Sequence, residues 1–295
     1  GMNMKKKSSL KHTGAFWAFC APCCILFGVF FLVPLVLSIA FSFTNYDGWK
    51  TIDFVGLTNY ITLFKDSKFY LSLGRTLLYT VCTLPFRVII PLLVAVLLCS
   101  KRVAGKSLTR TMVYIPVLMS ALVVGITINW MFSQEYGLVN FIIRSLGGTA
   151  LEWSLNPRLA TFVIAFASVW ASIGFNMILY IGGINSISND LYEAATIDGA
   201  SGVQAFFRIT VPMLAPTTFM VVLLSTVNLL KEYALVQGIT QGGPGLSTTF
   251  IIQYIFDKGF NQMQYGYASA ISTVVMIIFA LIAFAQFKVN NGGET

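Results

Sequence analysis

The sequence is short of charged residues. Asp, Glu, Lys and Arg make up only 10% of its 295 residues, whereas 56% are hydrophobic and the mean hydropathy is +0.77. Soluble domains contain about 25% charged residues, so a chain of this composition could not cover a water-facing surface of ordinary size. The composition therefore excludes an ordinary soluble domain and predicts a protein whose solvent is largely lipid.

Residues that could perform catalysis are also scarce. The single histidine, His12, lies in the N-terminal tail, so a histidine-based triad is unavailable. The apolar segments contain no pair of carboxylates and no cluster of metal ligands. Five cysteines fall in apolar stretches, and no second cluster accompanies Cys20, Cys23 and Cys24. We therefore expect no catalytic residue and no metal site, and interpret the cysteines as small buried hydrophobic residues.

Long apolar runs divide the chain into predicted spans. They lie near residues 14–43, 71–99, 109–132, 159–184, 213–238 and 267–287. Each supplies the ~20 residues that a bilayer-spanning helix needs, and a helix satisfies its own backbone polar groups in lipid. None of the loops is long enough for a separate folded domain. We therefore predict an all-α membrane protein with six transmembrane helices, forming a single transmembrane domain over residues 1–295.

The distribution of lysine and arginine predicts the orientation in the membrane. Much of the net charge of +8 lies in short segments beside the apolar runs, which is typical of membrane proteins rather than nucleic-acid-binding proteins. The densest clusters, at residues 5–11 and 101–110, fall on the same side of the predicted membrane. Because positive residues concentrate in cytoplasmic loops, we expect both termini, the tail 1–13 and the loop 186–212 to be cytoplasmic.

Residues 192–212, YEAATIDGASGVQAFFRITVP, carry the most specific pattern in the chain. Its fixed positions are Glu193, Ala194, Ala195, Gly199, Ile209 and Pro212. Their spacing resembles the EAA signature of ABC importer permeases, and the one departure is Val211, where leucine is usual. The resemblance implies a type I ABC importer permease, the membrane subunit of a binding-protein-dependent importer.

The same segment has a predicted local structure. Residues 188–190, Ser-Asn-Asp, favour a helix start, and Glu193 follows the last of them at the spacing of a capping box. A short helix is expected over about 190–198, and Gly199 can end it by adopting a positive φ. Pro212 is expected to open the next span, where its missing N–H costs little. The alternative is an interfacial helix that only connects two spans.

The resemblance also implies partners. In such permeases this loop is a coupling helix that docks into a cleft of the cytoplasmic ATPase. The residues implied in ATPase coupling are Glu193, Ala194, Ala195, Asp198, Gly199, Ile209 and Pro212. A second homologous permease, two cytoplasmic ABC ATPase subunits and an extracytoplasmic solute-binding protein would complete the transporter. No cofactor is expected in this chain, because Gly105-Lys106-Ser107 resembles the end of a Walker A loop but the first glycine of that loop is missing. ATP and Mg would instead be bound by the ATPases.

A second resemblance narrows the cargo. Residues 240–244, TQGGP, resemble the T-x-G-G-P segment of sugar importers, and residues 54–60 and 137–140 resemble their first two outer loops. The set is similar to the maltose-permease-like subunit of carbohydrate uptake transporters. It implies import of carbohydrate, with oligosaccharides favoured, across a bacterial cytoplasmic membrane. An importer for another solute, such as glycerol phosphate or a polyamine, and a secondary transporter are the alternatives.

The fifth apolar run contains unusual polar residues. Ser225, Asn228 and Glu232 recur at i, i+3 and i+7, so they share one face of a continuous helix. Ionisable residues at membrane depth are costly and are usually functional or paired. In a sugar site Asn228 and Glu232 would bind hydroxyl groups, whereas in a structural network Glu232 would be balanced by Arg87 or Lys231. Further substrate-path candidates on the preceding run are Trp170, Ser172, Phe175 and Asn176.

Overall fold

The computed structural model describes residues 17, 19–49, 52–100 and 105–291. The predicted tail 1–13, with its lysines and His12, lies outside these residues, as do Lys101 and Arg102. Within the described ranges the regular structure is helical, apart from one isolated β-bridge between Thr44 and Phe54. The chain divides into a smaller unit, residues 1–66 with 255–277, and a larger unit, residues 67–254 with 278–295.

Several described helices are long and apolar enough to cross a membrane. Four are continuous: Phe19–Phe41, Ser67–Cys99, Pro157–Asn185 and Tyr265–Asn290. Two more spans are formed if each bent helix pair is taken as one: Lys106–Leu118 with Ala121–Met131, and Gly202–Met213 with Ala215–Leu230. The predicted all-α membrane fold is therefore confirmed, with up to six spans among the described residues, but two of the six predicted helices are broken rather than continuous.

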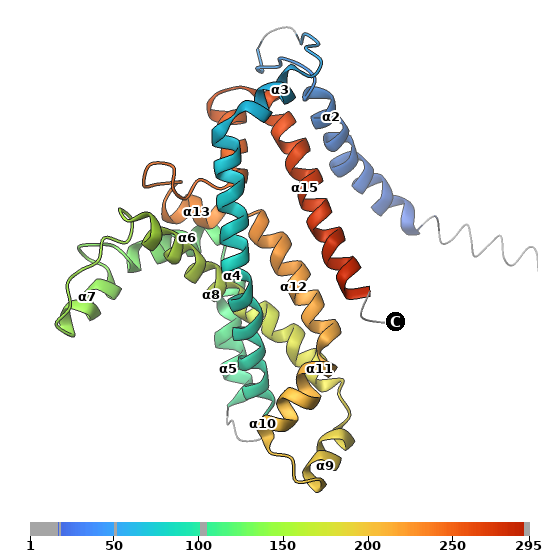
Figure 1. Cartoon of the computed structure of the whole chain (residues 1–295), viewed down its shortest axis with the longest axis vertical. Helices are drawn as coiled ribbons and strands as arrows, with labels where there is room; N and C mark the ends of the chain where they lie inside the picture. The colour runs from blue at the N-terminus through green and yellow to red at the C-terminus, as the bar shows by residue number, and fades with distance from the viewer. Residues whose placement is uncertain (1–16, 18, 50–51, 101–104, 292–295) are drawn as a thin grey trace, which may run out of the picture. The chain divides into compact units, whose positions relative to one another are not determined.

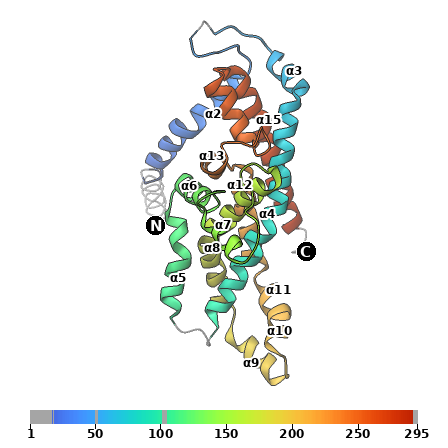
Figure 2. The ribbon, with the colours of Figure 1, turned by 90° about the vertical axis from the view of Figure 1, so that its left-hand side faces the viewer.

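The centre of the larger unit is a pair of long helices that lie side by side, α4 (Ser67–Cys99) and α8 (Pro157–Asn185), with α12 (Ala215–Leu230) packed against both (Figures 1 and 2). Buried apolar side chains join them in two clusters. The first includes Tyr79, Val124, Ile128, Ile164, Leu229 and Leu235. The second includes Ala95, Met177, Tyr180, Leu214 and Val221. These clusters hold the framework that positions the polar groups described below.

Prolines within or near the apolar runs, among them Pro85, Pro91 and Pro116, are expected to kink or break helices. Helix α4 nevertheless continues through Pro85 and Pro91, whereas the third span does break at Pro116. A proline inside a helix leaves the carbonyl four residues earlier without its usual N–H donor. For Pro91 that carbonyl belongs to Arg87, and Asn176 of α8 donates to it from Nδ2 at 2.9 Å. The neighbouring helix thus supplies the hydrogen bond that the proline removes, as a backbone group in a membrane requires.

The third predicted span, 109–132, is bent by 101°. It consists of α5 (Lys106–Tyr114), the 3-10 turn η2 (Ile115–Leu118) and α6 (Ala121–Met131). Met119 and Ser120 lie between them with extended backbones, at ψ 145° and 136°. Because two successive extended residues interrupt the helical hydrogen bonds, α6 takes a new direction.

Two glycines allow α6 to touch α13 (Ala234–Ile239) backbone to backbone. A Cβ on Gly125 would lie 3.0 Å from the Gly238 Cα, and a Cβ on Gly238 would lie 2.8 Å from the carbonyl oxygen of Leu122. The distance at Gly238 is too short for a side chain without a shift of the backbone, and the distance at Gly125 is tighter than ordinary Cβ contacts. This close approach fixes the two short helices against each other.

The fifth predicted span, 213–238, is wrong at both ends. Pro212 does not open it but lies inside a helical stretch made of α10 (Gly202–Ala205), the π-helix η3 (Phe206–Thr210) and α11 (Val211–Met213). A bend of 67° follows, and α12 begins at Ala215. At its other end α12 stops at Leu230, and the chain turns before α13.

The remaining elements are shorter. The larger unit also contains α7 (Leu138–Ser145), α9 (Asn189–Ile197) and most of α14 (Ile251–Phe256). The smaller unit contains η1 (Gly28–Leu32), α2 (Val33–Phe41), α3 (Thr58–Lys65) and η4 (Asp257–Asn261). Helix α15 (Tyr265–Asn291) begins in the smaller unit. In the smaller unit the Tyr267 hydroxyl donates a hydrogen bond to the Asp66 carboxylate at 2.7 Å.

The interpretation of the cysteines as buried is wrong for Cys23, Cys24 and Cys82, which are exposed.

Candidate functional site

A cavity of about 520 Å³ lies within the larger unit. Its walls come from α4, η2, α6, α8, α12 and the turn before α13. The lining residues with polar side chains are Arg87, Ser172, Asn176, Ser225, Asn228, Lys231, Glu232 and Tyr233. Phe175 also lines it, so every predicted substrate-path residue except Trp170 contributes to this polar cavity. Trp170 instead packs, half-buried, against the first hydrophobic cluster.

Part of the polar cavity is a buried network that is already satisfied. Asn176 and Ser225 are 3% and 2% exposed, and the Asn176 Nδ2 donates both to the Ser225 Oγ at 3.2 Å and to the Arg87 carbonyl. The Arg87 guanidinium donates from Nε and Nη2 to the carbonyl oxygen of Ser168, at 3.2 and 3.1 Å. Ser172 donates back to Val169 within α8. These side chains tie α4, α8 and α12 together at the cavity wall.

A second group at the wall keeps its hydrogen-bonding capacity. Among the described residues, the side chains of Asn228 and Lys231 have no hydrogen-bond partner, and both are exposed. The half-buried Glu232 uses Oε1 to accept from the Leu235 N–H at 3.2 Å, and a carboxylate, with about four acceptor sites, can accept further hydrogen bonds. A ligand in the cavity could therefore meet an amide, an ammonium group and a carboxylate oxygen within five successive residues, 228–232.

Glu232 does not share a helical face with Ser225 and Asn228, contrary to the sequence-based expectation. Glu232 is not on α12, because that helix ends at Leu230 and Lys231 caps it. Its carboxylate binds an amide in the first turn of α13, where helix N–H groups lack internal partners. Glu232 reaches the same cavity through this turn rather than through a shared helical face.

The charged residues that line the cavity are two cations, Arg87 and Lys231, and one carboxylate, Glu232. Arg87 and Glu232 attract each other electrostatically, but the hydrogen bonds of Arg87 go to the Ser168 carbonyl. The sequence suggests Arg87 as a structural partner of Glu232, and the structure also places it at the cavity wall. Its position near the middle of the second span was the available signal.

The segment 188–212 forms the second candidate site, and we call it the coupling segment. In α9 the Ser188 Oγ accepts from the Asp190 N–H at 3.2 Å. The helix ends in a Schellman motif, with the Ala200 N–H bonded to Ala195 and the Gly199 N–H to Thr196. Gly199 has φ 76°, as its predicted role requires.

One local expectation for this segment is wrong. Ser188, not Asp190, caps α9, and Glu193 makes no capping box there. The capping box forms at the next helix, where Ser201 and Gln204 exchange hydrogen bonds of 3.3 and 2.7 Å. Ser201 and Gln204 have the required spacing, which was the signal that could have found this cap.

The coupling segment is anchored on one side and bare on the other. Tyr192 and Ile209 pack against the second hydrophobic cluster, and the Tyr192 hydroxyl hydrogen-bonds the Thr210 hydroxyl at 2.9 Å. Neither α9 nor α10 contains a buried residue. The predicted coupling residues with exposed positions are Glu193, Ala194, Asp198, Gly199 and Pro212, whereas Ala195 and Ile209 are half-buried.

Apolar side chains accompany this exposure. Ile197 is 86% exposed and Val203 67%, and Leu191 and Phe207 are also exposed. Both views place α9 at an end of the larger unit, away from α6 and α13 (Figures 1 and 2). Exposed apolar side chains on a short, well-capped helix are typical of a surface that binds another protein.

Spanning helices around a polar cavity, with an anchored helical segment at one end, define a membrane transport subunit. The chain belongs to the family of binding-protein-dependent transport system inner membrane components, whose family model matches residues 55–291. It is therefore a multi-pass membrane protein and a transport component rather than an enzyme.

Individual relatives agree with this assignment. The chain is 32% identical to the probable ABC transporter permease protein YesP of Bacillus subtilis, over 98% of this chain and 94% of that protein. It is also 32% identical to the lactose transport system permease protein LacF of Rhizobium radiobacter, over 92% of each. A crystal structure of a bacterial ABC transporter that imports the acidic polysaccharide alginate contains a chain with the same fold, at a TM-score of 0.83, 23% identity and coverage of 97% and 98%.

Proposed function

We propose that this chain is the permease subunit of an ATP-driven importer for carbohydrate, with oligosaccharides as the cargo. Support comes from relatives whose names specify sugars. One is the arabinooligosaccharides transport system permease protein AraP of Bacillus subtilis, 32% identical over 93% of this chain and 88% of that protein, and another is LacF. Nearly the whole chain is matched in each, so the similarity includes the helices that line the polar cavity.

The observation that carries the proposal is the set of free polar groups at the polar cavity. Asn228, Lys231 and Glu232 offer both donors and acceptors, which is what sugar hydroxyls require. Phe175, 43% exposed, offers an aromatic face beside them. A small number of polar groups beside an aromatic ring is the usual composition of a small-molecule site. The cavity forms half of the translocation path, and a second homologous permease completes it.

The coupling segment supports the rest of the assignment. Its bare apolar surface suits a cytoplasmic ABC ATPase, and two such subunits bind ATP and Mg and drive transport. An extracytoplasmic solute-binding protein delivers the sugar from the opposite side. The protein lies in the bacterial cytoplasmic membrane with both termini and the coupling segment in the cytoplasm, an orientation that the lysine and arginine clusters favour.

The experiment is ATP-dependent uptake by proteoliposomes that contain the assembled transporter, with its solute-binding protein outside. The cargo panel contains arabino-oligosaccharides, lactose, glycerol phosphate and a polyamine. We expect accumulation of at least one oligosaccharide and none of the last two. Uptake of glycerol phosphate or the polyamine without any sugar would contradict the carbohydrate assignment, and uptake without ATP would contradict the importer assignment.

A further inference from the structure

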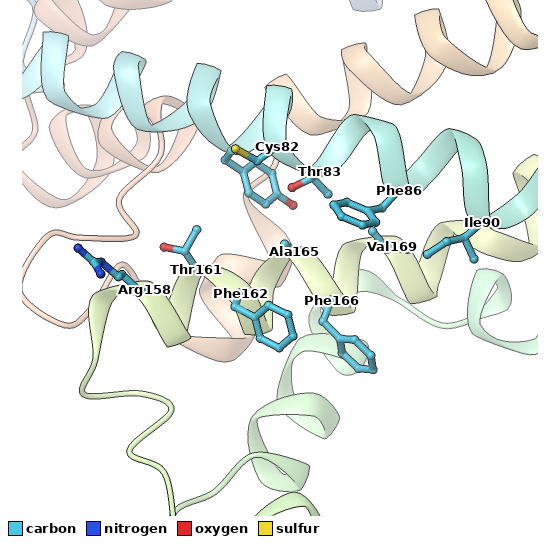
Figure 3. Close-up of a pocket in the computed structure, with 11 residues that line it drawn as sticks. Cys82, Thr83, Phe86, Ile90, Arg158, Thr161, Phe162, Ala165, Phe166 and Val169 are labelled. Atoms are coloured by element: carbon cyan, nitrogen blue, oxygen red, sulfur yellow. The ribbon is translucent and has the colours of Figure 1, made fainter.

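A second cavity, of about 400 Å³, lies between α4 and α8 and shares no lining residue with the polar cavity. Figure 3 shows its walls: Cys82, Thr83, Phe86 and Ile90 from α4, and Arg158, Thr161, Phe162, Ala165, Phe166 and Val169 from α8. Tyr79 completes the lining. We call this space the α4–α8 groove. Its lining is apolar over most of its length, and its one charged residue is Arg158.

The groove has the depth of one membrane leaflet. From Arg158 to Val169 the helix rises roughly 16 Å, at ~1.5 Å per residue, and from Tyr79 to Ile90 the facing helix rises by the same amount. One leaflet of the hydrocarbon core is about 15 Å deep, half of ~30 Å. Arg158 is in the first turn of a spanning helix, so it lies at the level of the lipid head groups while Val169 and Ile90 lie near the centre of the bilayer.

The groove is apolar, open at its side and narrow. Phe86, Phe162 and Phe166 are 58%, 53% and 43% exposed, so its rim is not covered within the larger unit. A helix of this length, with a diameter of ~10–12 Å, occupies more than roughly 1,000 Å³. The cavity of about 400 Å³ cannot enclose it, whereas a single flexible hydrocarbon chain fits.

Arg158 is the positively charged residue at the end of the groove where a lipid head group would lie. It is exposed, and among the described residues its guanidinium has no hydrogen-bond or ion-pair partner. Arginine binds phosphate oxygens through two parallel hydrogen bonds and remains charged at the membrane surface. A cation at head-group level above an apolar slot is complementary to a phospholipid with a negatively charged head group.

We propose that the α4–α8 groove binds one anionic phospholipid, with its phosphate on Arg158 and one acyl chain along α4 and α8. The site is separate from the polar cavity, and the proposal does not depend on the cargo. In the orientation proposed above, the lipid belongs to the outer leaflet of the cytoplasmic membrane.

The test uses the complete transporter in nanodiscs and a phosphatidylglycerol with a photoreactive group near the end of one acyl chain. We expect the label on the α4 and α8 peptides that contain Ile90 and Val169. Arg158→Gln should reduce this labelling roughly fivefold, the effect of one positive charge at a membrane surface. Lys65→Gln, which removes an exposed charge at the end of α3, should leave it unchanged.

A second pair of variants tests the slot itself. Ala165→Phe fills the groove and should abolish the labelling, whereas Ala280→Phe adds the same bulk at an exposed position of α15 and should not. This pair keeps the test decisive if Arg158→Gln lowers the yield of complex.

Four results would overturn the proposal. Equal labelling by a photoreactive phosphatidylcholine would exclude recognition of the anionic head group. Labelling of all spans to the same extent would indicate bulk lipid only. A disulfide between Phe166→Cys and a cysteine in the partner permease would assign the groove to a protein interface. Excess inorganic phosphate should not displace the lipid, and displacement would show that Arg158 holds a free anion instead.

Discussion

The polar cavity and the coupling segment place polar and apolar groups in opposite arrangements. At the cavity, Asn176, Ser225 and Arg87 are buried and their hydrogen bonds go to neighbouring helices. In the coupling segment, side-chain hydrogen bonds cap the starts of α9 and α10. The apolar side chains of Ile197 and Val203 are exposed there. The three buried groups at the cavity are satisfied within the chain, whereas exposed apolar side chains are typical of a surface that binds another protein. The comparison therefore separates hydrogen-bonded, packed helices from a surface that is available for contact.

The largest expected effect is at Gly199, where the comparison predicts loss of contact without loss of folding. Gly199→Asp places a side chain at φ 76°, which costs about 1 kcal/mol or more, and adds a charge to the bare surface. ATP-dependent uptake should be abolished while the protein still inserts into the membrane. The measurement is uptake and ATPase co-purification, normalised to permease in the membrane.

Gly202→Ala is the matched control for that variant. Gly202 is also exposed, with no atom within 4 Å of an added Cβ, but it is not at positive φ. It should support normal uptake. Normal uptake by Gly199→Asp, with normal ATPase association, would rule out the coupling assignment.

The next effect concerns the rigid region. Gly238→Ala puts a Cβ 2.8 Å from the Leu122 carbonyl oxygen and should destabilise the α6–α13 contact by about 1–3 kcal/mol. A lower thermal midpoint of the purified complex is the readout. Gly182→Ala, where an added Cβ has open space, is the control, and equal midpoints for the two variants would show that the contact is not close in the assembled protein.

A smaller effect is expected from the free groups at the polar cavity. Asn228→Ala should remove roughly 0.5–1.5 kcal/mol of interaction with the sugar, which is about a 2- to 12-fold loss of uptake, and Glu232→Gln should cost more because a charge is involved. The affinity of the solute-binding protein should not change. Uptake of two sugars of different length, normalised to assembled complex, is the measurement.

The structural alternative predicts another pattern for these two variants. If Glu232 only orders the start of α13 and balances Arg87, Glu232→Gln should lower detergent stability and affect both sugars equally. That outcome, together with poor assembly, would contradict the binding-site assignment.

The smallest effect tests the anchor of the coupling segment. Tyr192→Phe removes one hydrogen bond to Thr210 but keeps the ring packed against the core, so the cost should be about 0.5–1.5 kcal/mol. ATPase association should persist, and the ratio of sugar imported to ATP hydrolysed should fall slightly. Loss of ATPase association would mean that this bond shapes the docking surface directly.

The sequence predicted much of this arrangement, and Pro116 indicated the break in the third span, but the breaks in the fifth span were missed. Apolar length gave the spanning segments, and the turn chemistry of Gly199 gave the end of α9. Residues 231–233, where α12 gives way to α13, contain no proline or glycine that would signal a break. The structural features found there are the hydrogen bond from the Leu235 N–H to Glu232 and the close contact between Gly125 and Gly238. Those are tertiary effects, which hydropathy cannot report.

The candidate site was predicted in the same partial way. Polar residues inside apolar runs identified the cavity wall, since such residues are rarely placed in lipid. The sequence could not separate Asn176, whose amide is already used, from Asn228, whose amide is free. Trp170 has the residue type expected of a sugar site but lies in a packing position. Which groups remain available depends on hydrogen-bond partners from distant segments.

The hydrogen bond from Asn176 to the carbonyl opposite Pro91 has a mechanical consequence. A buried carbonyl that loses its donor raises the free energy of the protein, so sliding of α4 past α8 by a helical turn would be opposed by the loss of this hydrogen bond. Ser225 adds α12 to the same junction. The three helices therefore share one hydrogen-bonded junction, and the sharp bends of the chain, 101° and 67°, lie outside it, near Met119–Ser120 and Leu214.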